Sequence, residues 1–209
     1  MKIIFAIHST DDHFGFAYRE IGMEEIREEF FIKRFEKDLS NNLIIDLGKF
    51  LYKKNFESIK RIAISTGPSN FNASRQIAAC ARTISHQLKC PLDHFSSFRI
   101  IAKRIAIKNK ILDQKESFWI FKKLKNRGYI VGKYFINYNP DKVLINSVDE
   151  LIKPKLFKRF EKQKFQYSVN YDMREDLKEL IELSYSNHKK CINTPWDEAL
   201  PIYPLSATN

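Results

Sequence analysis

The sequence predicts a mixed α/β fold, and two observations lead to that prediction. Hydrophobic residues follow strand-like spacing in several short segments of the first half and helical spacing in longer segments beside them. A second, weaker set of strands and a helix follows in the rest of the chain. With 209 residues, 44% of them hydrophobic, the chain can bury one solid core or two small ones.

Seven elements are predicted in the first half. The strands are 2–8, 13–20, 24–34 and 59–65, and the helices are 40–55, 69–88 and 95–107. The hydrophobic spacing of 59–65 predicts a buried strand. The strand 24–34 mixes hydrophobic residues with charges, which is typical of a sheet edge. Ser40 is the predicted N-cap of the first helix.

From about residue 115 the predicted elements are fewer. They are strands at Phe118–Lys123, Tyr129–Asn137 and Val143–Ile145, and a last helix at Arg174–Tyr185. The first two strands flank Asn126-Arg127-Gly128, a good hairpin turn, and Asp172 stands near the start of the last helix. We therefore expect a domain at 1–110 and a smaller one at 111–209.

A turn between a strand and a helix is the most informative motif. The apolar strand ends at Gly67-Pro68-Ser69, and the small-residue helix 69–88 follows directly. Free backbone N–H groups at a helix N-terminus suit an anion or a partner's carboxylate, although a purely structural turn has the same sequence features.

This motif resembles the GPGSFTGLR segment of the TsaB (YeaZ) family through Gly67, Pro68, Ser69, Phe71 and Arg75. Further segments are similar to family segments in the same order. They are Ile3–Thr10, Phe14–Tyr18, Lys89–Leu92, Phe95–Phe98 and the tail Pro195–Pro204.

The resemblance implies an actin-like, sugar-kinase-like ATPase fold (ASKHA) with one complete N-terminal lobe and a reduced C-terminal lobe. It implies a non-catalytic subunit that supports TsaD in making threonylcarbamoyl-adenosine on transfer RNA. A TsaE-like ATPase and a second copy of the chain are further partners to consider. In that family the helix after the motif and the helix before it form the partner contact, so we expect Arg75, Ala78, Ala79 and Arg82 at the interface.

The sequence favours no catalytic, cofactor or metal site. Catalytic members of this fold class carry an acidic residue in the first hairpin turn, where this chain has His8, followed by Asp11 and Asp12. Imidazole is a poor ligand for magnesium, which prefers oxygen. Neither a GxxxxGK loop nor a histidine pair with zinc-helix spacing is present. The alternative enzymatic hypothesis, a residual ATPase or phosphotransferase, requires Asp11, Asp12 and the Gly67 turn to hold a metal-bound nucleotide.

Charge favours a second alternative, an RNA-binding module. Residues 99–168 contain 18 Lys and Arg against 6 Asp and Glu, which gives +12, whereas the whole chain carries +11. Because these lysines are scattered among strand residues, the sequence predicts no clustered stacking platform and only weak, sequence-blind RNA binding. A solvated lysine-rich surface has the same composition.

The three cysteines have no metal-ligand spacing and are expected to be reduced thiols. We find no run of apolar residues long enough for a membrane span, and we expect a cytoplasmic protein without membrane contact.

Overall fold

The computed structural model describes residues 2–35, 39–51, 56–111, 117–139 and 144–203, and it divides into two compact units. The first unit consists of Met1–Phe95 together with Asp172–Pro201. The second consists of Ser96–Tyr171 with the residues from Ile202 onward. The mixed α/β prediction is confirmed, since each unit combines a sheet with helical structure.

The first unit is built on a five-stranded sheet in the order β3-β2-β1-β4-β5. Its strands are β1 (Lys2–Ser9), β2 (His13–Ile21), β3 (Glu28–Arg34), β4 (Ile59–Ser65) and β5 (Leu92–Phe95). The first three are antiparallel neighbours, and β4 and β5 continue parallel to β1. As predicted, β3 is an edge strand and β4 is buried. The strand β5 was not predicted from the sequence.

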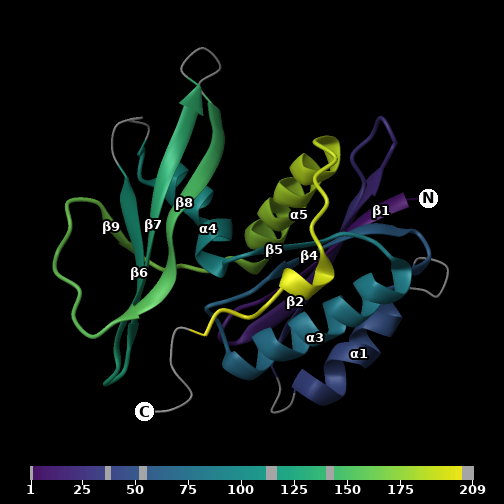
Figure 1. The fold of residues 1–209 in the computed structure, drawn as a ribbon, viewed down its shortest axis with the longest axis horizontal. Helices are drawn as coiled ribbons and strands as arrows, with labels where there is room; N and C mark the ends of the chain where they lie inside the picture. The colour runs from purple at the N-terminus through teal and green to yellow at the C-terminus, as the bar shows by residue number, and fades with distance from the viewer. Residues whose placement is uncertain (1, 36–38, 52–55, 112–116, 140–143, 204–209) are drawn as a thin grey trace. The chain divides into compact units, whose positions relative to one another are not determined.

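In the described part of the chain, α-helices cover both faces of this sheet (Figure 1). The helices α1 (Leu39–Phe50) and α3 (Phe71–Leu88) share one hydrophobic cluster with the odd-numbered residues of β1, such as Phe5. The helix α5 (Met173–Lys189) lies on the other face, where a Cβ on Gly15 would meet its first turns. Since α1 begins at Leu39, Ser40 lies inside the helix and is not its N-cap.

The second unit consists of α4 (Ser97–Lys108) and a four-stranded sheet in the order β8-β7-β6-β9. Its strands are β6 (Phe118–Leu124), β7 (Gly128–Asn139), β8 (Leu144–Phe157) and β9 (Gln166–Ser168). The predicted short strand at 143–145 falls at the start of the much longer β8, with residue 143 outside the described residues, and β9 was missed. Hydrophobic residues of α4 and one sheet face form a core of their own.

The predicted hairpin between β6 and β7 is confirmed. Asn126 and Gly128 both have positive φ, 60° and 97°. A Cβ at Gly128 would lie 2.3 Å from the carbonyl oxygen of Phe157, so the close approach of β8 requires glycine there.

The division between the units differs from the expected boundary after residue 110. The chain leaves the first unit after Phe95 and returns to it at Asp172. Leu177, Leu180 and Ile181 of α5 have no exposed surface and pack on the first sheet, whereas α4 packs on the second. Burial of these hydrophobic faces, and not order along the chain, determines which unit each helix joins.

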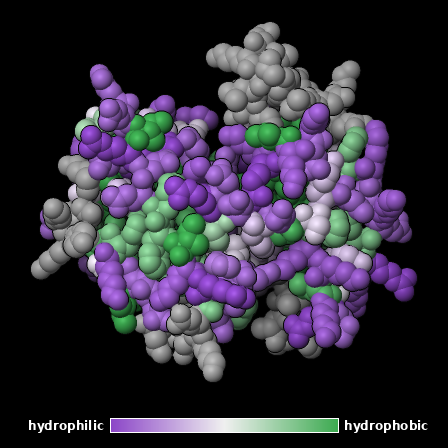
Figure 2. Space-filling model, turned by 180° about the vertical axis from the view of Figure 1, so that it is seen from behind, coloured by the Kyte–Doolittle hydropathy of each residue, from purple (hydrophilic) through white to green (hydrophobic). Residues whose placement is uncertain are grey.

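Most of the face shown in Figure 2 is hydrophilic, and hydrophobic residues reach the surface there in patches. Among the described residues, no helix combines the length and the apolar character needed to cross a membrane.

Candidate functional site

The main candidate site is an apolar groove of about 480 Å³ between α1 and α3. Apart from Gln76 and Thr83, all its lining residues are hydrophobic. They are Leu43, Ile44 and Leu47 of α1, Phe56, and Ala79, Cys80 and Ile84 of α3. Ile44 is 60% exposed and the next residue, Ile45, is 56% exposed. Neighbouring exposed isoleucines beside a groove are typical of a surface that another protein covers.

The groove arises from the spacing of residues on the two helices. Leu43 and Leu47 of α1 are buried in the core of the first unit. Ile44 follows Leu43 directly and therefore lies on a different side of the helix, where it is exposed. On α3, Ile77 and Ala81 are buried in the core of the first unit, and Ala79 lies on the exposed side. Small residues at the exposed side let a second helix approach closely.

The four expected interface residues do not share one surface. Ala79 lines the groove, and Arg75 is exposed one turn earlier with its guanidinium 5.4 Å from the ring centre of Phe71. Ala78 is only 3% exposed and belongs to the core. Arg82 is half-buried and lies 5.3 Å from the ring centre of Trp196, so the chain's own tail already engages it.

Cys80, at the floor of the groove, is a poor nucleophile. Burial raises its pKa to about 11, so the thiol stays protonated at neutral pH. Its contribution to the groove is therefore that of a small hydrophobic side chain.

The turn that carries the family-like motif is closed by its own hydrogen bonds. Ser69 Oγ lies 3.2 Å from Ser9 Oγ and 2.8 Å from Ser74 Oγ. The N-cap of α3 is Asn70, whose side chain accepts a hydrogen bond from the Ala73 amide at 3.2 Å. Gly67, with φ of 93°, and Pro68 are buried beside it. Because these hydrogen-bonding groups already bond within the turn, the geometry favours a structural turn over a phosphate-binding loop.

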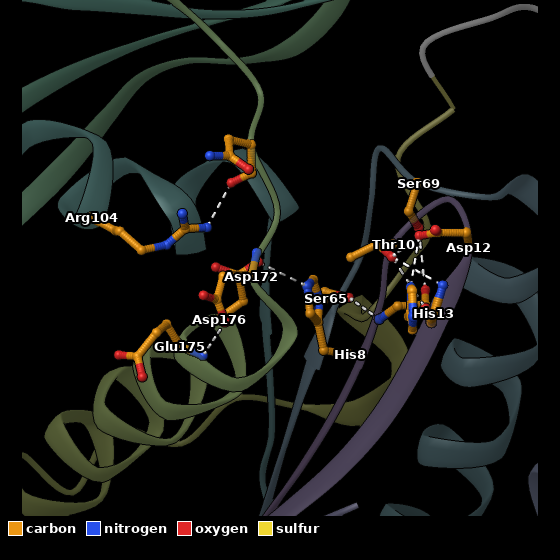
Figure 3. Close-up of polar contacts among 12 residues, drawn as sticks. His8, Thr10, Asp12, His13, Ser65, Ser69, Arg104, Asp172, Glu175 and Asp176 are labelled. Carbon is orange, nitrogen blue, oxygen red and sulfur yellow. Dashed lines mark hydrogen bonds and ion pairs between the residues drawn. The ribbon is translucent and has the colours of Figure 1, made fainter. Parts of the chain in front are cut away.

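The position expected to be acidic in catalytic proteins is occupied by a buried histidine. His8 has no exposed surface, and its Nε2 lies 3.7 Å from Oδ2 of Asp176, which is 1% exposed (Figure 3). The same carboxylate accepts a hydrogen bond from the Asp172 amide. Asp176 was not predicted from the sequence, because its only signal is its place in the first turn of α5, where acidic residues are common.

The other two candidate acids lie in the β1–β2 turn. Asp11 and Asp12 are both exposed, and Asp12 Oδ1 lies 2.9 Å from His13 Nδ1. The hydrogen bond from His13 is the main cause that lowers the pKa of Asp12. Across the described part of the chain, no three His, Cys, Asp or Glu residues lie together as a metal site would require.

The tail that resembles the family's ending packs on the first unit as far as Pro201. The Leu92 amide of β5 donates to the Thr194 carbonyl at 3.0 Å, and the His86 and Trp196 rings meet edge to face at 5.0 Å. Pro204, the last residue of the matching tail, lies outside the described residues.

No protein-family model and no curated protein sequence matches this chain. Among solved structures it is similar to an uncharacterised Pseudomonas aeruginosa protein described as similar to peptidase YeaZ. The TM-score is 0.71 at 13% identity, over 98% of this chain and all of the other. It is also similar to YeaZ from Pseudomonas aeruginosa, with a TM-score of 0.68 at 13% identity, over 97% of this chain and all of the other. The chain therefore has a YeaZ-like fold, and the predicted actin-like α/β class is confirmed.

Proposed function

We propose that this chain is a TsaB-like accessory subunit that docks on a TsaD-like catalytic subunit and supports threonylcarbamoyl-adenosine modification of transfer RNA in the cytoplasm. It has no active site of its own, and its part in the modification of transfer RNA is played within that complex. A TsaE-like ATPase and a second copy of the chain are further partners in this proposal.

One observation carries the proposal: an exposed apolar groove lies between the two helices that the family resemblance assigns to the partner contact. Its exposed hydrophobic residues, Ile44 and Ala79, are the kind of surface that a partner helix buries. The YeaZ-like fold supports the same assignment.

The turns support a non-catalytic role. His8 replaces the expected acid, and the hydroxyl groups around Ser69 bond to one another. The residual ATPase hypothesis gains nothing from Asp11 and Asp12, because both are exposed and Asp12 is engaged by His13.

The test is binding of the purified chain to the cognate TsaD-like protein by isothermal titration calorimetry. Ala79→Glu places a charge in the groove that the partner would have to desolvate, so we expect affinity to fall about 30-fold or more, or about 2 kcal/mol. The matched control is Asn72→Glu, which adds the same charge at an exposed site of α3 outside the groove.

The melting temperature of each variant separates docking from folding. We expect Ala79→Glu to melt within a few degrees of the parent chain, since Ala79 is exposed. Normal binding by Ala79→Glu, or an equal loss with Asn72→Glu, would contradict docking through the groove.

A further inference from the structure

The face of the second sheet that points away from α4 carries both aromatic and basic side chains. Side chains alternate between the two faces of a strand, so Phe118 and Ile120 of β6 enter the core with α4 while Trp119 and Phe121 lie on the outer face. The register places Lys133 of β7 opposite Trp119. We call this surface the outer face.

Five aromatic rings gather on the outer face. Phe160, from the segment after β8, lies 5.7 Å from Trp119, 5.9 Å from Phe121, 6.2 Å from Tyr129 and 6.4 Å from Phe157, measured between ring centres. All five rings are half-buried. The sequence predicts no clustered stacking platform, but β8 and the segment after it bring Phe157 and Phe160 together with the three rings of the β6–β7 hairpin.

Positive charges surround and overlie these rings. Lys133 Nζ lies 5.1 Å from the Trp119 ring centre, and Lys155 Nζ lies 5.4 Å from that of Phe157. Lys123, opposite Tyr129 in the register, is exposed. On the same face Asp149, opposite Phe135, is exposed and accepts a hydrogen bond from Asn137 at 2.8 Å.

We propose that the outer face binds unpaired nucleotides of RNA, with Trp119 as the main stacking ring and Lys123 and Lys133 as phosphate contacts. Sheets with aromatic side chains and basic groups on one face commonly bind single-stranded nucleic acid, because every base can stack and every phosphate is anionic. An acidic protein would use the lysines but has no need of rings interleaved with them. The surplus of +12 across residues 99–168 favours a polyanion of either kind.

This activity is independent of the groove between α1 and α3, so it can be tested with the full chain alone. The probe is a fluorescein-labelled oligouridine, and its anisotropy is measured over a range of salt concentrations. Trp119→Ala is expected to weaken binding about 5- to 150-fold, the effect of losing one base–aromatic stack. The double variant Lys123→Glu/Lys133→Glu is expected to weaken binding and to flatten the salt dependence.

A matched control reverses two exposed lysines of the first unit, in Lys60→Glu/Lys190→Glu, and changes the net charge equally. We expect it to keep most of the affinity. A loss equal to that of the outer-face double variant would show a diffuse charge effect and overturn the proposal.

A second readout does not depend on whether Trp119→Ala folds. The chain has two tryptophans, so Trp196→Phe leaves Trp119 as the single reporter. Stacking predicts that oligouridine quenches this fluorescence, whereas polyglutamate, which can bind only through charge, leaves it unchanged. Absence of oligouridine binding at low salt, or binding without quenching, would overturn the proposal. Tighter binding of polyglutamate than of oligouridine would assign the face to an acidic protein instead.

Discussion

At the scale of single residues, one buried carboxylate ties the first unit together. Asp93 of β5 has no exposed surface, and its Oδ1 lies 2.7 Å from Nη1 of Arg61 on β4. It also accepts hydrogen bonds from Ser184 at 2.6 Å and from Asn187 and Thr194 at 2.9 Å each. One side chain thus joins β4, α5 and the tail, and it contributes to structure, not to the proposed docking.

Replacing this carboxylate should destabilise the chain strongly. Asp93→Ala leaves Arg61 as a buried charge without its carboxylate, so we expect the free energy of unfolding to fall by about 3–5 kcal/mol. Urea denaturation followed by circular dichroism measures the loss. Asp197→Ala removes an exposed carboxylate and is expected to change stability by no more than about 0.5 kcal/mol. Similar losses in the two variants would show that the buried network contributes little.

At the scale of elements, local patterns predicted most helices and strands but not their surroundings. A nearly continuous run of hydrophobic residues marked β1, and the run Ile62–Ile64 marked β4. Asp172 is the N-cap of α5, and its side chain accepts a hydrogen bond from the Glu175 amide. The four-residue β5 and three-residue β9 were missed because such short segments carry too little periodic signal.

The candidate sites depend on contacts between residues far apart in the chain, which a sequence pattern does not show. The resemblance placed Ala79 in a candidate interface, but it could not separate Ala79, which lines the groove, from Ala78, which is buried in the core. Which of the two alanines is exposed depends on the orientation of α3 about its own axis relative to the sheet. Asp176 meets His8 across a sequence separation too long for any local pattern to reveal.

The structure of the turns after β1 and β4 predicts that the chain has no catalytic activity, which enzyme assays can test. We expect the purified chain to show neither magnesium-dependent ATP hydrolysis nor peptidase activity, because the acids of the β1–β2 turn are exposed and the hydroxyl groups of the Gly67 turn bond to one another. Phosphate release and peptide cleavage are assayed beside Asp11→Ala and Asp12→Ala. Turnover above background that either substitution abolishes would instead support the residual ATPase hypothesis.

At the scale of the whole molecule, the first unit is discontinuous along the chain. Residues 96–171, which form most of the second unit, stand in sequence between β5 and α5, and α5 then completes the first unit. The sequence-based boundary after residue 110 failed for this reason. Strand patterns predicted a second set of elements from about residue 115, whereas the second unit begins at Ser96, and only the buried face of α5 shows that the last helix belongs with the first sheet.

This organisation predicts which fragments fold. A fragment of residues 1–110 lacks α5, so it leaves uncovered the sheet face on which Leu177, Leu180 and Ile181 are fully buried. Burial of such side chains contributes roughly 1.5–3 kcal/mol each, and three of them amount to a large share of the roughly 5–15 kcal/mol that stabilises a typical domain. We therefore expect this fragment to show no cooperative thermal transition by circular dichroism.

A matched fragment restores the missing helix by joining residues 1–95 to 172–203 through a flexible Gly/Ser linker. It keeps the five-stranded sheet, the helices α1, α3 and α5 and the Asp93 network, and we expect it to unfold cooperatively. Adding Asp93→Ala to it should lower its melting temperature, because the same buried Arg61 then loses its carboxylate. Cooperative folding of 1–110, or failure of the linked fragment to fold while the full chain does, would show that the first unit does not depend on α5 in this way.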